Sequence, residues 1–234
     1  MADTEHELQP HELKALKRKM IVFPGIVLLV LAVLIFLPAG TFHYWQAYVY
    51  IAVLLCPMVL VVGYFFKKDP RFLERRMRIK EKETTQKKIV SVSFLFFIAG
   101  YLIPGLDHRF GWSDIPAGIV LMADVLVMAG YLFIFAVFKV NRYASRVIQV
   151  DKDQTVITTG PYRIIRHPMY LGSIVLFMST PVALGSYWGV LPFIAVPVSM
   201  VFRILNEEKV LSEQLSGYKE YCSIVRFRLL PYIW

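Results

Sequence analysis

Long apolar runs constrain the fold of this chain more than any other feature of its sequence. Six such runs cover residues 20–38, 44–66, 89–106, 115–138, 169–184 and 187–202. A helix of about 20 apolar residues crosses the hydrocarbon core of a bilayer, and 57% of the 234 residues are hydrophobic. The sequence therefore predicts an all-α polytopic membrane protein with about six transmembrane helices. The last two runs are short and separated by Gly185-Ser186, so they predict a short helical hairpin towards the C-terminal end.

The positive charges are distributed asymmetrically along the chain. The net charge is +9, and in a six-span chain all of the 26 Lys and Arg residues except Arg109 fall on one side. The positive-inside rule predicts that this side, with both termini, is cytoplasmic. Connector 67–88 holds ten basic and four acidic residues, a composition typical of an amphipathic helix on anionic headgroups. Membrane topology accounts for the basicity, so we expect membrane lipids and no nucleic acid as partners.

Polarity also divides the chain into three parts. Residues 1–20 form a polar arm, residues 21–138 hold the first four spans, and residues 139–234 hold a polar connector, the hairpin and the tail. Asp124 lies inside the fourth span, where a carboxylate is costly and is a candidate functional group; the sequence assigns it no role. Cys56 and Cys222 have no metal-ligand spacing, so free thiols and no metal site are expected.

The stretch 158–172 combines helix starts with polar side chains between two apolar regions. Pro161 and Pro168 can each open a helix, because the first turn leaves N–H groups unpaired and proline has none. His167 would then precede a helix N-terminus, where donors and the positive dipole end collect. Two interpretations are open: a juxtamembrane turn with arginines reaching the interface, or a polar pocket at the membrane face. The pocket would contain Tyr162, Arg166, His167 and Tyr170.

The last apolar run continues into a polar helical segment. Arg203 and Glu207 are four residues apart and share one helical face, with Glu208 beside them. They could form a surface ion pair worth about 0.2–0.5 kcal/mol. Alternatively, Arg203 could bind an anionic substrate while Glu207 binds a cationic or hydroxyl-bearing cofactor. Spacing alone leaves both interpretations open.

Five separated motifs in residues 141–234 resemble the isoprenylcysteine carboxyl methyltransferase family and its relatives, the integral-membrane phospholipid methyltransferases. The motifs are Gly160-Pro161-Tyr162, Arg166-His167-Pro168-Met169-Tyr170-Leu171-Gly172, Glu207-Glu208, Gly217-Tyr218 with Tyr221, and Arg226-Phe227-Arg228-Leu229-Leu230-Pro231. The resemblance implies an S-adenosylmethionine-dependent methyltransferase whose cytosol-facing cofactor pocket is closed by the tail. No G-x-G-x-x-G sequence occurs, so a Rossmann-type cofactor site is not expected.

The resemblance also implies which residues form the site. Arg203 would be the substrate-side residue, and we count Arg166 with it as catalytic. The cofactor would contact Gln149, Gln154, Thr155, Val156, Ile157, Tyr162, His167, Pro168, Met169, Tyr170 and Glu207. The stretch 154–157 departs from the eukaryotic members, which tend to begin it with His. We expect a bacterial or archaeal plasma membrane rather than the endoplasmic reticulum.

The resemblance does not fix the acceptor. We expect carboxyl O-methylation of a lipidic or prenylcysteine-like molecule that enters from the bilayer, with N-methylation of a phospholipid amine as the alternative. Membrane sterol reductases end similarly to residues 226–233, but they are longer and bind a nicotinamide cofactor. The Gly160-Pro161-Tyr162 motif favours methyl transfer. A transporter or scaffold is less well supported, because Asp124 is the main charge inside the spans.

Overall fold

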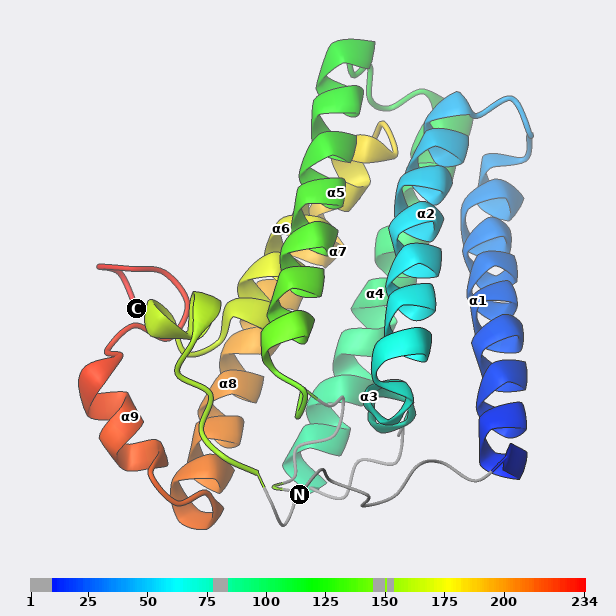
Figure 1. The fold of residues 1–234 in the computed structure, drawn as a ribbon. Helices are drawn as coiled ribbons and strands as arrows, with labels where there is room; N and C mark the ends of the chain where they lie inside the picture. The colour runs from blue at the N-terminus through cyan, green and yellow to red at the C-terminus, as the bar shows by residue number, and fades with distance from the viewer. Residues whose placement is uncertain (1–9, 78–83, 145–149, 151–153) are drawn as a thin grey trace.

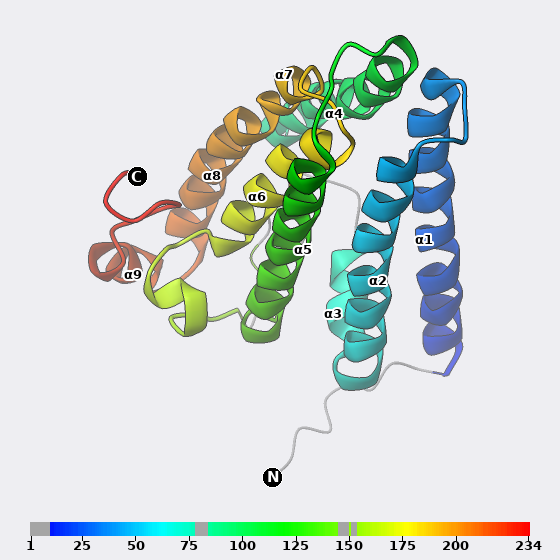
Figure 2. The same ribbon diagram turned by 90° about the horizontal axis from the view of Figure 1, so that it is seen from above.

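The computed structural model describes residues 10–77, 84–144, 150 and 154–234, and this part of the chain contains helices and no strand. The long helices are α1 (Pro10–Ala39), α2 (Trp45–Lys68), α4 (Thr84–Phe110), α5 (Ala117–Val140) and α8 (Ala195–Gln214). The shorter elements are α3 (Pro70–Arg76), the 3₁₀ turn η1 (Gly160–Arg163), α6 (Pro168–Ala183), α7 (Val190–Phe193) and α9 (Tyr218–Ile224). The helices form a bundle with α1 at one edge and α9 at the other (Figures 1 and 2).

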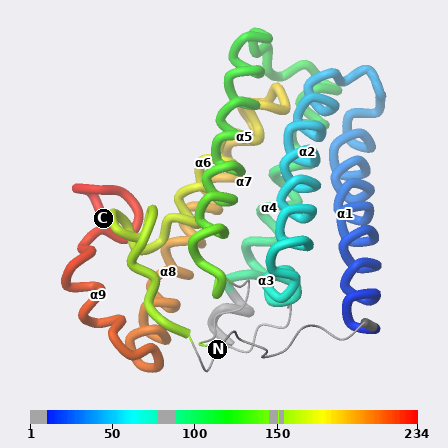
Figure 3. The backbone as a smooth tube through the Cα atoms, in the orientation of Figure 1, coloured from blue at the N-terminus to red at the C-terminus, as the bar shows by residue number. Residues whose placement is uncertain are grey.

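Five of these helices are long and apolar enough to cross a bilayer, so the predicted all-α polytopic fold is confirmed. They are the segments 11–39, 45–68, 89–110, 117–140 and 190–214, and α6 is a shorter apolar helix of 16 residues. The start of α1 and the ends of α2, α5 and α8 lie at the same end of the bundle (Figure 3). This is the end that carries the long basic connectors.

Two helix boundaries differ from the predicted spans. α1 begins at Pro10, so the second half of the predicted polar arm, with Lys14 and Lys17, belongs to the first long helix. The second arm of the predicted hairpin is divided into α7 and α8, and α8 continues to Gln214. That extension places Arg203, Glu207 and Glu208 on one continuous helix. The polar end of α8 thus lies beyond the apolar run that the sequence analysis counted as a span.

The basic connector 67–88 is not one amphipathic helix. α2 ends at Lys68, and the side chain of Asp69 accepts a hydrogen bond of 3.0 Å from the backbone N–H of Phe72. Asp69 therefore caps a separate helix, α3, which Pro70 opens. Phe72 and Leu73 are buried, so α3 packs against the bundle instead of lying only on headgroups. Residues 78–83 of this connector lie outside the described part.

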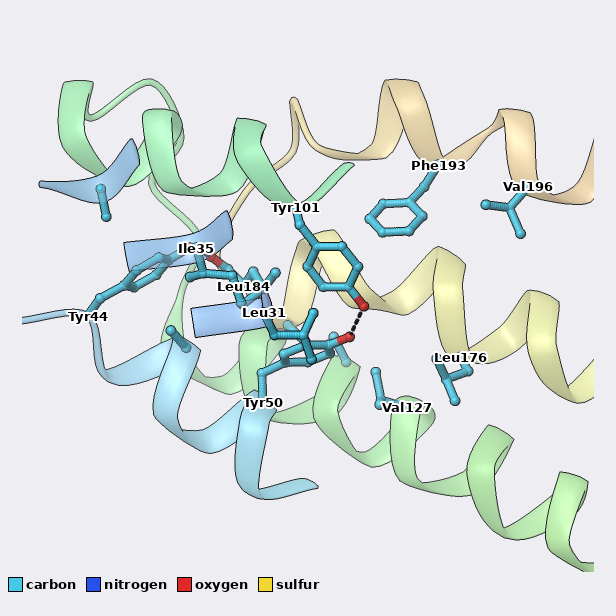
Figure 4. Close-up of a cluster of buried hydrophobic side chains, with 14 residues drawn as sticks. Leu31, Ile35, Tyr44, Tyr50, Tyr101, Val127, Leu176, Leu184, Phe193 and Val196 are labelled. Carbon is cyan, nitrogen blue, oxygen red and sulfur yellow. Dashed lines mark hydrogen bonds between the residues drawn. The ribbon is translucent and has the colours of Figure 1, made fainter. Parts of the chain in front are cut away.

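The central core contains tyrosine hydroxyls among its apolar side chains (Figure 4). The Tyr50 and Tyr101 hydroxyls are 2.6 Å apart, and Tyr50 also contacts Thr180 Oγ1 at 3.2 Å. These bonds join α2, α4 and α6 and satisfy polar groups that burial would otherwise leave unpaired. Asp124 on α5 is 4% exposed, and its carboxylate has no hydrogen-bond partner among the described residues. Its role stays unassigned.

At the bundle end away from α9, Asp107 joins two connections. Its carboxylate accepts hydrogen bonds of 2.7 Å from the backbone N–H and the hydroxyl of Ser113, and another from the Ser186 hydroxyl. Asp107 is 1% exposed. It therefore ties the α4–α5 connection to the turn that follows α6.

The most extensive helix contact is between α5 and α6, and it depends on two glycines. A Cβ atom at Gly130 would lie 2.8 Å from the carbonyl oxygen of Gly172. A Cβ atom at Gly172 would lie 2.8 Å from Ile134 Cγ1 and 3.1 Å from the Gly130 carbonyl oxygen. Small residues allow helix backbones to approach closely in membranes. This contact positions α6, which follows His167 directly and carries Tyr170 in its first turn.

We expect Gly130→Ala to lower the free energy of unfolding by about 1–3 kcal/mol, because the added methyl group has no space without separating α5 from α6. The measurement is thermal or denaturant unfolding in detergent. Gly118→Ala is the matched control on the same helix, since nothing lies within 4 Å of its added Cβ. Equal effects of the two substitutions would contradict the close-contact explanation.

Candidate active site

A polar cleft lies where the first turn of α6, the polar half of α8, the extended stretch 154–157 and helix α9 meet. We call it the polar cleft; its volume is about 100 Å³. Its lining consists of Asn141, Tyr143, Ala144, Gln154, Thr155, Val156, Ile157, Tyr162, Arg166, His167, Met169, Tyr170, Arg203, Glu207, Leu211, Leu215, Tyr218 and Tyr221. The two prolines act as predicted, because Pro161 lies at the start of η1 and Pro168 opens α6. They turn the chain so that its polar side chains face one cleft.

Glu208 is the electrostatic centre of this region. Its Oε1 lies 3.1 Å from Arg166 Nε and 3.2 Å from His167 Nε2. Its Oε2 accepts a hydrogen bond of 2.8 Å from Arg228 Nε. The Glu208 side chain is 11% exposed, so the carboxylate is stabilised by these partners rather than by water. Glu208 thus joins α8, the segment before α6 and the residues after α9, 225–234, which we call the tail.

The tail is also held by backbone hydrogen bonds. The N–H of Arg166 donates to the Phe227 carbonyl and the N–H of His167 donates to the Arg228 carbonyl, both at 2.9 Å. These bonds accompany a parallel bridge between Ile165 and Phe227. The tail therefore runs beside the entry to α6 and holds the backbone of His167 in place.

A hydrogen-bonded chain connects Arg203 with Glu207. Arg203 Nε donates to the Tyr170 hydroxyl at 2.9 Å, and that hydroxyl donates to Glu207 Oε2 at 2.6 Å. All three side chains line the polar cleft. The interpretation of Arg203 and Glu207 as only a surface pair therefore does not fit, because Tyr170 from α6 lies between their functional groups. Tyr170 is 6% exposed.

Tyr162 closes the cleft on the side of η1. Its hydroxyl accepts a hydrogen bond of 2.8 Å from Asn141 Nδ2, and its carbonyl accepts one of 2.8 Å from the Tyr221 hydroxyl. Burial raises the pKa of Tyr162 to about 12, so its hydroxyl stays protonated at neutral pH. Tyr162 therefore offers the cleft a neutral hydroxyl and an aromatic face.

The wall formed by α9 is apolar with one buried hydroxyl. Leu215, Tyr218 and Tyr221 pack together with Val156 from the stretch 154–157, so this segment contributes to packing as well as to the cleft. The Tyr218 hydroxyl is buried with no hydrogen-bond partner among the described residues. Burial raises the pKa of Tyr218. A buried donor without a partner in the wall of a cleft is available to a ligand.

A second cavity of about 540 Å³ lies next to the polar cleft, and we call it the apolar pocket. It is lined by Arg76, Ile89, Val90, Ser93, Phe94, Phe97, Ile134, Met169, Tyr170, Ser173, Ser199, Met200 and Arg203. Met169, Tyr170 and Arg203 line both cavities. The two cavities therefore meet at the hydrogen-bonded chain that links Arg203 to Glu207.

The structure brings together most of the residues predicted for the site. Gln154, Thr155, Val156, Ile157, Tyr162, Arg166, His167, Met169, Tyr170, Arg203 and Glu207 line the polar cleft. Pro168 does not line it, and Gln149 lies outside the described residues. Arg166 and His167 contact Glu208, which the sequence analysis noted only as the neighbour of Glu207. Arg76 was not singled out because its place in a basic run gave no sign of a pocket.

Comparison with known families bears on this same region. The model of the phospholipid methyltransferase family matches residues 119–217. The predicted resemblance to membrane methyltransferases is confirmed. The matched range holds 16 of the 18 lining residues of the polar cleft; the other two, Tyr218 and Tyr221, lie just beyond it on α9. The match supports an integral-membrane methyltransferase and leaves the acceptor open.

One curated relative has a different activity. Over 84 residues the chain is 29% identical to Delta(14)-sterol reductase TM7SF2 of Mus musculus. The alignment covers 34% of this chain and 20% of the reductase, so the chain spans about a fifth of that relative's length. This similarity agrees with the expected relation to membrane sterol reductases and makes reduction the alternative to test.

We expect Glu208→Gln to lower the free energy of unfolding by about 3 kcal/mol. The substitution leaves the guanidinium groups of buried Arg166 and partly buried Arg228 without their carboxylate. The measurement is thermal unfolding, combined with limited proteolysis of the tail. The matched control is Glu213→Gln, an exposed carboxylate near the end of the same helix, for which a change within about 0.5 kcal/mol is expected. Similar losses in both variants would contradict the central role of Glu208.

Proposed function

We propose that this chain is an S-adenosylmethionine-dependent integral-membrane methyltransferase that transfers a methyl group to the carboxylate of a lipidic acceptor. The observation that carries the proposal is the meeting of a polar cleft and an apolar pocket at Met169, Tyr170 and Arg203. The family match over residues 119–217 supports methyl transfer. The cleft lies at the basic end of the bundle, and the positive-inside rule predicts a cytoplasmic position for that end.

The residues of the polar cleft fit S-adenosylmethionine chemically. Glu207 offers a carboxylate to hydroxyl or amino groups, and the unpaired Tyr218 hydroxyl offers a buried polar group. The aromatic faces of Tyr162 and Tyr170 suit an adenine ring or a sulfonium cation. The cleft volume of about 100 Å³ is smaller than the roughly 300–1,000 Å³ of ligand sites. Cofactor binding is therefore expected to widen the cleft, with its walls moving apart.

A carboxylate acceptor suits the remaining side chains. The cofactor supplies a methyl group on a sulfonium; transfer to a carboxylate oxygen forms the O–C bond, breaks the C–S bond and leaves a neutral thioether. A carboxylate is ionised at neutral pH because its pKa is about 3.5, so no general base is needed. Arg203 would orient the acceptor, and the shared wall would hold both partners at high effective concentration. Closure by the tail would exclude water.

An amine acceptor is the second candidate, because the matched family is named for phospholipid methyltransferases. An amine must lose a proton before it attacks, so a base is required. Glu207 is the carboxylate among the described lining residues of the cleft, but it already accepts the short hydrogen bond from Tyr170. A carboxylate acceptor needs no such base, so we prefer it to an amine.

The deciding experiment is a cofactor titration of the purified protein. S-adenosylhomocysteine should give a saturable heat of binding in calorimetry, whereas NADPH should give none. The described lining of the cleft has a carboxylate, Glu207, close to its arginines, which disfavours a phosphate group. Saturable binding of NADPH without binding of S-adenosylhomocysteine would overturn the proposal in favour of the reductase alternative.

A second experiment separates Arg203 from Glu207. Glu207→Gln should weaken S-adenosylhomocysteine binding about tenfold or more, because a charge-assisted hydrogen bond contributes about 1.5–3 kcal/mol. Arg203→Leu should keep most cofactor affinity and lower turnover, and Arg203→Lys should restore it only in part, since lysine lacks bidentate geometry.

Tyr170→Phe is the necessary control for these variants, because the Tyr170 hydroxyl connects the two side chains. If it reproduces neither effect, each side chain acts directly on its ligand. Parallel loss of cofactor binding in Glu207→Gln, Arg203→Leu and Tyr170→Phe would contradict separate roles.

A further inference from the structure

The apolar pocket is built to hold a chain-like apolar ligand that comes from the bilayer. α4 supplies much of its wall, including Val90, Phe94 and Phe97, and α6 and α8 supply the facing side chains. Val90 is 47% exposed and Phe94 60% exposed on the outer surface of the bundle. The pocket therefore extends from the surface that faces the bilayer to the shared wall with Met169 and Tyr170.

The charges of this pocket all have one sign. Among its described lining residues, Arg76 and Arg203 are the charged ones, and none is a carboxylate. Arg203 reaches it from α8, on the side of the shared wall. Arg76 reaches it from the last turn of α3, which precedes the matched region 119–217. An apolar cavity with two guanidinium groups and no acidic group is complementary to an anionic amphiphile.

Arg76 is positioned at the junction rather than on the open surface. Its guanidinium carbon lies 4.6 Å from the centre of the Phe138 ring. Its Nη1 lies 3.8 Å from Met169 Sδ, an atom of the shared wall. Arg76 is also close enough to Tyr162 to affect its hydroxyl electrostatically. The contacts with α5 and α6 place the guanidinium at the meeting point of the two cavities.

We infer that Arg76 is a further acceptor-binding residue, and that with Arg203 it binds the acceptor carboxylate while the acyl or alkyl chain occupies the apolar pocket. The inference rests on the proposed function, which supplies the carboxylate acceptor. A planar guanidinium can donate two parallel hydrogen bonds to a carboxylate. The surrounding apolar walls strengthen the attraction by excluding water. Arg76 therefore selects anionic over neutral or cationic amphiphiles.

The test measures binding without any methyl donor. Dodecanoate, dodecanol and dodecyltrimethylammonium are titrated into the purified protein in neutral detergent. The unsubstituted protein should bind dodecanoate most tightly. Arg76→Gln should weaken dodecanoate binding about tenfold, the size expected for losing one charged hydrogen bond, and leave dodecanol binding unchanged. Arg76→Lys should recover only part of the loss.

The matched control is Arg71→Gln, which removes a positive charge from the same short helix at a residue that lines neither cavity. It should leave dodecanoate binding unchanged. An equal loss in Arg71→Gln would overturn the inference, since general surface charge would then explain the preference. An equal loss of dodecanol binding in Arg76→Gln would also overturn it, because Arg76 would then only support the pocket wall.

Two further outcomes separate this inference from the proposed function. If S-adenosylhomocysteine fails to bind but dodecanoate binding depends on Arg76, the proposed function fails and the anionic site stands. If S-adenosylhomocysteine binds and Arg76→Gln changes neither dodecanoate affinity nor the KM for a carboxylate acceptor, the assignment of Arg76 fails alone. Dodecyl phosphate is a further probe. If it binds more tightly than dodecanoate and its binding depends on Arg76, the carboxylate assignment is overturned.

Discussion

The buried carboxylate of Glu208 is the interaction on which the candidate site depends. It contacts Arg166 and His167 from the segment before α6 and Arg228 from the tail. A carboxylate with low exposure is stable only when cations and donors replace the water it has lost. If one of the three partners moves away, the buried charges that remain lose part of their compensation. The entry to α6, the polar half of α8 and the tail therefore behave as one unit.

Around this unit, two environments of opposite character share a wall. On one side the polar cleft has hydroxyl, amide and carboxylate groups, and on the other the apolar pocket opens to the surface that faces the bilayer. Tyr170 lies in the wall, between Arg203 and Glu207. A water-soluble ligand and a membrane-soluble ligand can meet here without either leaving its own solvent. The close α5–α6 contact through Gly130 and Gly172 keeps that wall in place.

The sequence predicted the membrane helices because hydrophobic length is a local property. It also predicted the polar lining around His167 and Glu207, through prolines, helix spacing and the family resemblance. It did not predict the central position of Glu208, because the partners of this carboxylate lie far from it in the sequence. Only folding brings Arg228 beside it. Arg76 was missed for the same reason. The division of connector 67–88 depended on one local cap at Asp69, whose effect was hidden by the surrounding charge.

The hydroxyl of Tyr170 links ligand binding in the polar cleft to ligand binding in the apolar pocket. Because it is bonded to Arg203 on one side and to Glu207 on the other, a ligand that repositions it in one cavity changes the wall of the other. Coupling of this kind is reciprocal: whatever factor one ligand adds to the affinity of the second, the second adds to the first. Tyr170 is therefore the side chain through which occupancy of one cavity would be communicated to the other.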